Sequence, residues 1–372
     1  MTDQLDAPSL RQVAMVFDLN KCMGCQTCSV ACKVLWTRDE DTEHEWWCTV
    51  NTQPGLGAPK DWEEMGGGWE GGKPKPGHQP TRAEFGGGWK FNYEEVFYGG
   101  KGREVHLKPS GPGMWTSGGD GSPGSSASSY DGKAPDQDVT QWGPNWDEDQ
   151  GAGEWPNAYY FYLPRICNHC TKPSCVSACP QGAMYKRPQD GIVLRDEDRC
   201  RGYRFCMEAC PYKKIYFNYA RQVSQHCIFC FPRLEQGVAP ACARQCPGRL
   251  VFVGYLDDTE GPIHRLVNEW KVAVPLHAEY GTEPNVFYVP PLSPYSLNED
   301  FSIDYETPRI PPEYLEGLFG PGVHDALATL KSEMEKVREG GKSEMLETLI
   351  AYKWQSLFGP FTTDPATLTP TG

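Results

Sequence analysis

Cysteine spacing constrains the fold of this chain more than any other feature. Fifteen of its sixteen cysteines fall into four motifs, with short gaps between neighbours. Disulfide-rich domains are small and have a much higher fraction of cysteine, so a disulfide framework does not fit a chain of 372 residues. Close bunching is typical of metal ligation. The motifs are Cys22-x2-Cys25-x2-Cys28-x3-Cys32; Cys167-x2-Cys170-x4-Cys175-x3-Cys179-Pro180; Cys200-x5-Cys206-x3-Cys210-Pro211; and Cys227-x2-Cys230-x11-Cys242-x3-Cys246-Pro247.

The ends of the motifs favour iron–sulfur clusters over zinc. A cubane cluster takes one thiolate at each of four irons, and in two-cluster ferredoxins the fourth cysteine, followed by proline, ligates the other cluster. Three of the four motifs end in Cys-Pro. Zinc also uses CxxC pairs, but it would leave these exchanged cysteines unexplained. Because proline suits the first turn of a helix, we expect each fourth cysteine to open a helix.

The order of the motifs predicts which of them share ligands. Only residues 184–199 separate motifs two and three, and they are typical of a β-hairpin with its turn at residues 188–191. These two motifs would form one two-cluster module, and motifs one and four the other. We number the predicted ligand sets as sites 1 to 4: Cys22, Cys25, Cys28 and Cys246; Cys32, Cys227, Cys230 and Cys242; Cys167, Cys170, Cys175 and Cys210; and Cys179, Cys200 and Cys206.

Site 4 is one thiolate short. Tyr203 stands where the second cysteine of the motif would be. Losing this ligand removes the anchor of one iron, so we expect a three-iron cluster, whose potential is raised because fewer thiolates bring less negative charge. A cubane with phenolate or solvent at the fourth iron is the alternative. Cys48 fits no motif, and we expect a small buried side chain there.

The remaining sequence divides at the motifs and predicts an α+β fold with two ferredoxin-like modules. Residues 12–48, opening on a strand at 13–17, would join 226–256 in the first module, and 158–225 would form the second. Residues 49–157 lack cysteine and are rich in Gly, Pro, Ser and Trp, which favours an interface arm over a solvated insertion. Residues 257–372 would be a C-terminal extension at a subunit interface. Helical spacing there predicts two helices, with apolar stripes over 323–337 and 345–357.

Composition and missing motifs exclude several functions. A net charge of −14 argues against a nucleic-acid partner. No apolar stretch approaches the length of a membrane span. The chain has no P-loop, GxGxxG, GxSxG or HExxH motif, so we expect a partner to perform the substrate chemistry. Residues 1–11 lack the features of an export signal, which favours the cytoplasm unless a partner with a signal carries the chain across.

The cysteine motifs and their surroundings resemble the iron–sulfur β subunits of the type II branch of the dimethyl sulfoxide reductase family. This branch includes nitrate, selenate, chlorate and perchlorate reductases, nitrite oxidoreductase, and dimethylsulfide and ethylbenzene dehydrogenases. Within this branch, the amino-acid sequence is most similar to the β subunits of archaeal-type, outward-facing nitrate reductases. The similarity covers residues 12–290 and, more loosely, the chain to Val323. It is found in residues 18–28 (DLNKCMGCQTC), 142–150 (WGPNWDEDQ), 165–170 (RICNHC), 185–187 (YKR), 200–203 (CRGY), 274–277 (VPLH) and 281–285 (GTEPN).

The resemblance implies a non-catalytic electron-transfer subunit with three [4Fe-4S] clusters and one [3Fe-4S] cluster, and with the ligand pairing given above. It implies an α subunit with a molybdenum bis-molybdopterin guanine dinucleotide centre and a haem b γ subunit, between which the clusters relay electrons. The complex would work on the periplasmic or outer face of the membrane, exported with α. A hydrocarbon or dimethylsulfide dehydrogenase, a selenate or chlorate reductase, and a stand-alone polyferredoxin are the alternatives.

Overall fold

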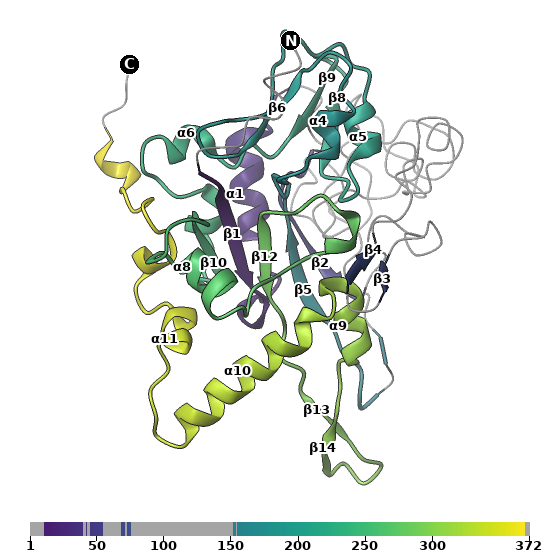
Figure 1. Ribbon diagram of the computed structural model, residues 1–372, viewed down its shortest axis with the longest axis vertical. Helices are drawn as coiled ribbons and strands as arrows, with labels where there is room; N and C mark the ends of the chain where they lie inside the picture. Colours follow the sequence, from purple (N-terminus) through teal and green to yellow (C-terminus); the bar gives the residue numbers. More distant parts are fainter. Residues whose placement is uncertain are drawn as a thin grey trace, which may run out of the picture.

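The computed structural model describes residues 11–39, 42, 45–54, 152–153 and 155–368, together with the backbone of two short strands at 68–70 and 73–75. These residues form short helices and small sheets, so the predicted α+β class is confirmed (Figure 1). Most of the predicted arm at 49–157, including the run at 142–150, lies outside the described residues.

A four-stranded sheet with the order β10-β1-β12-β11 forms the centre of the described structure. Strand β1 (Val13–Asp18) pairs antiparallel with β10 (Val251–Tyr255) and parallel with β12 (Val286–Val289), which also pairs with β11 (Val274–Pro275). Every residue of β1 is buried, as expected of an apolar strand covered on both faces. The predicted strand is therefore confirmed. Because β1 leads into motif one and β10 follows motif four, their pairing brings these motifs together.

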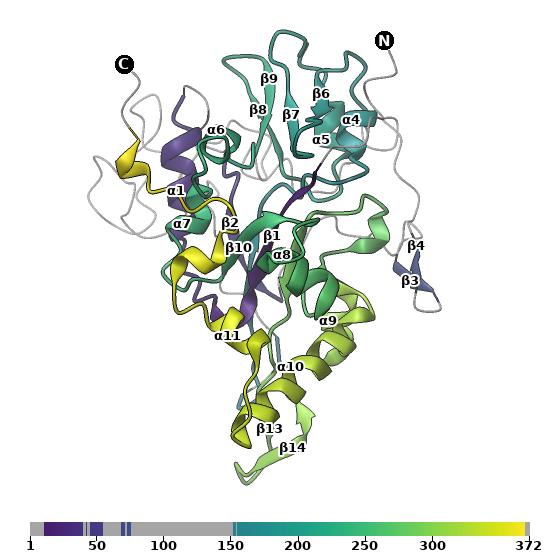
Figure 2. The same ribbon diagram turned by 60° about the vertical axis from the view of Figure 1, so that its left-hand side comes forward.

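Two hairpins and two short helices lie at the opposite end from α10 (Figures 1 and 2). The predicted hairpin between motifs two and three is confirmed, with β6 (Met184–Lys186) antiparallel to β7 (Val193–Arg195). Strands β8 (Ile215–Asn218) and β9 (Val223–His226) form the second hairpin. Helices α4 (Ser174–Ser177) and α5 (Phe205–Ala209) carry cysteines. These elements share a hydrophobic core that is separate from the larger core around the central sheet; its members include Val176, Met184, Val193, Met207, Ile215 and Phe217.

The helices of motifs one and four lie beside the central sheet. Helix α1 (Thr27–Trp36) packs against α7 (Ala241–Arg244), and α6 (Phe231–Leu234) begins directly after Cys230. The end of the chain runs along these helices (Figure 2), where Arg244 pairs with Asp364 at 3.1 Å. The other described elements are β2 (Thr49–Gln53), β3 (Gly68–Glu70), β4 (Lys73–Lys75), β5 (Phe161–Arg165), α8 (Pro262–His264), β13 (Tyr295–Leu297) and β14 (Ile303–Pro308).

The C-terminal segment contains the two expected helices, but one of them is shorter than expected. Helix α10 (Gly322–Arg338) is confirmed, and Gly340 ends it with φ +91°. Helix α11 (Glu344–Ile350) stops at Ala351, whose φ of +53° turns the chain, so the single helix expected up to residue 357 is wrong. Helix α9 (Pro312–Phe319) was not expected. Among the described helices, none is both long and apolar enough to cross a membrane.

Candidate iron–sulfur centres

All sixteen cysteines are free thiols in the structure. Fourteen are buried or half-buried, Cys48 is almost fully buried, and Cys25 is exposed. No disulfide joins any pair, so the disulfide interpretation is excluded by the geometry as well as by the spacing.

Three cavities are lined by cysteines from paired motifs. Each has one predicted ligand set in its wall. In each case the last cysteine of one motif joins the first cysteines of another, which is the exchange that a two-cluster ferredoxin requires. Several thiols around one cavity can each bind a different iron, which is the arrangement that a cluster with one thiolate per iron needs. The three sets are Cys167, Cys170, Cys175 and Cys210; Cys179, Cys200 and Cys206; and Cys22, Cys25, Cys28 and Cys246.

The four cysteines of site 2 are all buried and lie close enough to affect one another. Burial raises the pKa of Cys32 well above its usual range, and the nearby Cys227 and Cys230 raise it further. Burial likewise raises the pKa of Cys242, with added repulsion from Cys230, Cys32 and Cys227. The packing of α1 on α7 explains this convergence, because Cys32 and Cys242 lie on these two helices.

The buried thiols fit a positively charged occupant. Burial raises the pKa of Cys22, Cys170, Cys206 and Cys227 to about 12. Such groups stay protonated at neutral pH unless a cation replaces the proton, and metal binding does so while stabilising the fold. The donor set is therefore suited to iron, which would supply one-electron redox chemistry when bound.

A left-handed backbone turn recurs in all four cysteine motifs. It falls at Gly24, His169, Gly202 and Phe229, with φ of +67°, +43°, +68° and +53°. Each of these residues precedes the second ligand position of its motif, so the turn presents successive side chains to the same cavity. His169 and Phe229 hold this conformation although they are not glycine, which is uncommon and marks a position fixed by its surroundings.

The same turn places Tyr203 at the position of a missing cysteine. Tyr203 lies between Gly202 (φ +68°) and Arg204 (φ +62°), as Cys25 lies between Gly24 (φ +67°) and Gln26 (φ +58°). Arg204 and Gln26 each precede a helix, α5 and α1 respectively. Tyr203 lines the site 4 cavity, remains 53% exposed and stacks on Phe205 with 5.9 Å between ring centroids.

The prolines after the fourth cysteines do not open helices, so that prediction is wrong. In motifs two to four the cysteine at the third ligand position lies in a short helix that ends before the last cysteine of the motif. The proline then occupies the second position of a tight turn, where its fixed φ is favourable. The turns are closed by N–H groups of Gly182, Lys213 and Arg249, which donate to the carbonyls of Cys179, Cys210 and Cys246 at 3.2 Å each.

Two contacts beside the cysteines were not found from the sequence. Cys48 was expected to be a buried bystander; it is buried, but its thiol lies close enough to that of Cys28 for each to affect the pKa of the other. Lys214 is 3% exposed, lines the site 3 cavity and donates to the carbonyl of Trp46 at 3.3 Å. Burial lowers the pKa of Lys214 to about 7. Neither residue belongs to a motif, so their positions could be found only from the fold.

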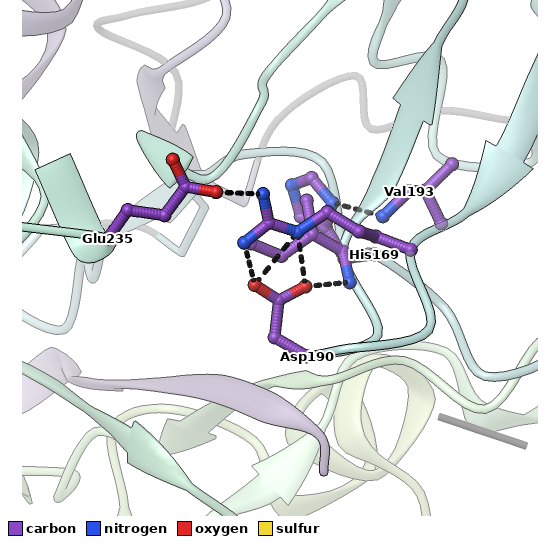
Figure 3. Close-up of polar contacts among 6 residues, drawn as sticks. His169, Asp190, Val193 and Glu235 are labelled. Atoms are coloured by element: carbon purple, nitrogen blue, oxygen red, sulfur yellow. Dashed lines mark hydrogen bonds and ion pairs between the residues drawn. The ribbon is translucent and has the colours of Figure 1, made fainter. Parts of the chain in front are cut away.

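An ion-pair network joins the turn between β6 and β7 to the segment of motif four that follows Cys230 (Figure 3). Arg187, beside β6, donates to Asp190 at 2.6 Å and to Glu235, beside α6, at 2.6 Å. His169 lies behind this network, and its Nδ1 accepts the N–H of Val193 at 3.1 Å. This contact makes Nδ1 the unprotonated nitrogen. Burial lowers the pKa of His169 well below its usual range.

Comparison with known proteins gives consistent matches over almost the whole chain. A family described as "4Fe-4S dicluster domain" matches residues 158–256. The selenate reductase subunit beta of Thauera selenatis is 51% identical over 94% of this chain and 99% of its own. The respiratory nitrate reductase subunit beta of Haloferax mediterranei is 53% identical over 91% and 90%. The dimethylsulfide dehydrogenase subunit beta of Rhodovulum sulfidophilum is 48% identical over 94% and 98%.

Proposed function

The chain belongs to the iron–sulfur β subunits of the dimethyl sulfoxide reductase family, and from this premise we propose that its four cysteine sites hold three [4Fe-4S] clusters and one [3Fe-4S] cluster. As such a β subunit, it is the non-catalytic electron-transfer component of an oxidoreductase complex. The observation that supports the cluster assignment is the lining of three cavities by ligand sets that combine two motifs each.

We assign sites 1, 2 and 3 to [4Fe-4S] clusters and site 4 to the [3Fe-4S] cluster. Sites 1 to 3 each have four predicted cysteine ligands, whereas site 4 has three and a half-exposed tyrosine at the fourth position. Sites 1 and 2 would form one ferredoxin-like module and sites 3 and 4 the other. The separate hydrophobic core around α4, α5 and the two hairpins supports this division.

The partner of this subunit is a catalytic molybdenum subunit, and we propose that it carries a bis-molybdopterin guanine dinucleotide centre. A haem b γ subunit would exchange electrons at the other end of the cluster series. The four clusters would move single electrons between these two centres, because the chain itself has no motif for a two-electron cofactor.

Nitrate reduction is the activity that we propose for the complex. Relatives named for selenate, nitrate and dimethylsulfide are similarly identical to this chain, which is expected if the substrate pocket lies in the catalytic subunit. We also propose that the complex works on the periplasmic or outer face of the membrane, carried there by its catalytic partner.

Metal analysis of the purified native complex tests this proposal. We expect about fifteen irons for this subunit, three cubanes with four irons each and one cluster with three. The oxidised protein should give the EPR signal of a three-iron cluster, and reduction should give signals from the cubanes. Zinc in place of iron, or the absence of a three-iron signal in protein with full iron content, would refute the assignment.

A further inference from the structure

Site 2 is the most enclosed of the four cysteine sites. All four of its cysteines are buried, whereas each other site includes cysteines that are only half-buried or are exposed. Hydrogen bonds are electrostatically stronger in such a low-dielectric surrounding, and an electron added there is poorly screened by water. A donor that reaches a sulfur at site 2 therefore has a larger effect on its cluster than the same donor at an exposed site.

The indole of Trp36 provides such a donor. Trp36 Nε1 lies 3.0 Å from Sγ of Cys230, across 194 residues of sequence. The indole N–H can only donate, so the sulfur is the acceptor. The ring is half-buried and packs against the main hydrophobic core, which holds it in place.

Helix geometry explains how Trp36 reaches this sulfur. Cys32 and Trp36 are four residues apart on α1, so they lie on the same face of the helix. Cys32 faces the cysteines of motif four, and Trp36, one turn further, meets Cys230 at the start of α6. Helix α1 thus brings both a predicted ligand and a hydrogen-bond donor to site 2.

We propose that Trp36 is a positioning residue that raises the reduction potential of the site 2 cluster through its N–H···S hydrogen bond to Cys230. The inference rests on the cluster assignment proposed above. Reduction adds negative charge that spreads onto the ligand sulfurs, and a donor stabilises this charge more than it stabilises the oxidised cluster. The N–H also fixes the orientation of the Cys230 side chain, whose pKa is raised by burial and lowered by the Ala241 N–H and by Trp36.

Trp36→Phe removes the donor and retains an aromatic ring. In the full complex, followed by EPR during a redox titration, one cubane should become harder to reduce and the other three clusters should be unchanged. The expected change in the ratio of reduced to oxidised cluster at a fixed potential is about three- to tenfold, where tenfold is 59 mV for one electron.

Trp47→Phe is the matched control. Trp47 is buried in the same core, but its Nε1 donates to a carboxylate oxygen of Glu45 at 3.1 Å and not to a sulfur. The Trp47→Phe substitution should leave the reduction potentials of all four clusters unchanged. The inference is overturned if Trp36→Phe leaves every potential unchanged with full iron content, or if both variants lower the same cluster equally.

A second measurement decides the matter if Trp36→Phe does not fold. In the wild-type complex with ¹⁵N-indole-labelled tryptophan, pulsed EPR of the reduced cubanes should detect a ¹⁵N nucleus coupled to one of them; no such coupling would overturn the inference. A wild-type complex without iron clusters would instead contradict the proposed function, so the two failures are distinguishable.

Discussion

Replacing Tyr203 with cysteine should convert the cluster at site 4 from three irons to four. The backbone at Tyr203 has the same left-handed neighbours as Cys25, so a thiol there would meet the site 4 cavity as Cys25 meets that of site 1. We expect the iron content to rise by one per chain and the EPR signal of the oxidised three-iron cluster to disappear.

The new thiolate should also lower the reduction potential of this cluster. A unit charge at about 4 Å contributes about 1 kcal/mol in water and about 4 kcal/mol at an effective dielectric constant of 20. Tyr203 is 53% exposed, so the thiolate alone would act between these limits, which correspond to about 40–170 mV for one electron. The added iron brings positive charge that offsets part of this effect, so the measured fall should be smaller than the upper limit. A redox titration followed by EPR measures this value.

Tyr203→Phe provides the control for Tyr203→Cys. It removes the phenol oxygen but adds no ligand, so a three-iron cluster should keep its signal and its iron content. If the phenolate instead holds a fourth iron, Tyr203→Phe would change both the EPR signal and the iron content. An oxidised spectrum and iron content that stay the same in Tyr203→Cys would refute the assignment of site 4.

Two further substitutions test the packing around the clusters. Gly24→Ala should lower the free energy of unfolding by about 1–3 kcal/mol, because φ is +67° and the new Cβ would lie 2.6 Å from the ring of Tyr162. Gly182→Ala, with φ +58° and open space, should cost less, and an equal loss in both would contradict the role of crowding. Arg187→Met should cost about 3 kcal/mol in chemical denaturation, since it leaves the buried Asp190 carboxylate without its cation. Arg199→Met, which removes an exposed ion pair, should cost about 0–1 kcal/mol, and similar losses in the two variants would disprove the burial argument.

Local sequence signals predicted the features that depend on local chemistry. The hairpin of β6 and β7 follows from a turn of Pro, Gln, Asp and Gly between short apolar runs. Helix α10 follows from its 3.6-residue periodicity and from the glycines after it. The grouping of cysteines at the cavities was also accessible, because their order along the chain and the short link between motifs two and three leave few arrangements.

The features that were missed depend on tertiary contacts. Ala351 ends α11 in a left-handed conformation for which alanine has no intrinsic preference, so its sequence gives no stop signal. The contacts of Trp36 with Cys230 and of Cys48 with Cys28 join residues whose spacing carries no periodicity. The proline after each fourth cysteine is compatible with both a helix start and a turn, and only the packing of the loop decides between them.

The pairing of β1 with β10 has a consequence for how the chain folds. Contacts at this edge of the sheet join residues as far apart as Arg11 and Asp257, which are separated by 246 positions in the sequence. Closing so long a loop has a high entropic cost, whereas the hairpins and helices of motifs two and three form from neighbouring segments. During synthesis, sites 1 and 2, which contain the N-terminal cysteines, can therefore be completed only after β10 and β12 have been made. Sites 3 and 4 can be assembled first, so iron delivery to this chain should proceed from the middle of the sequence outward.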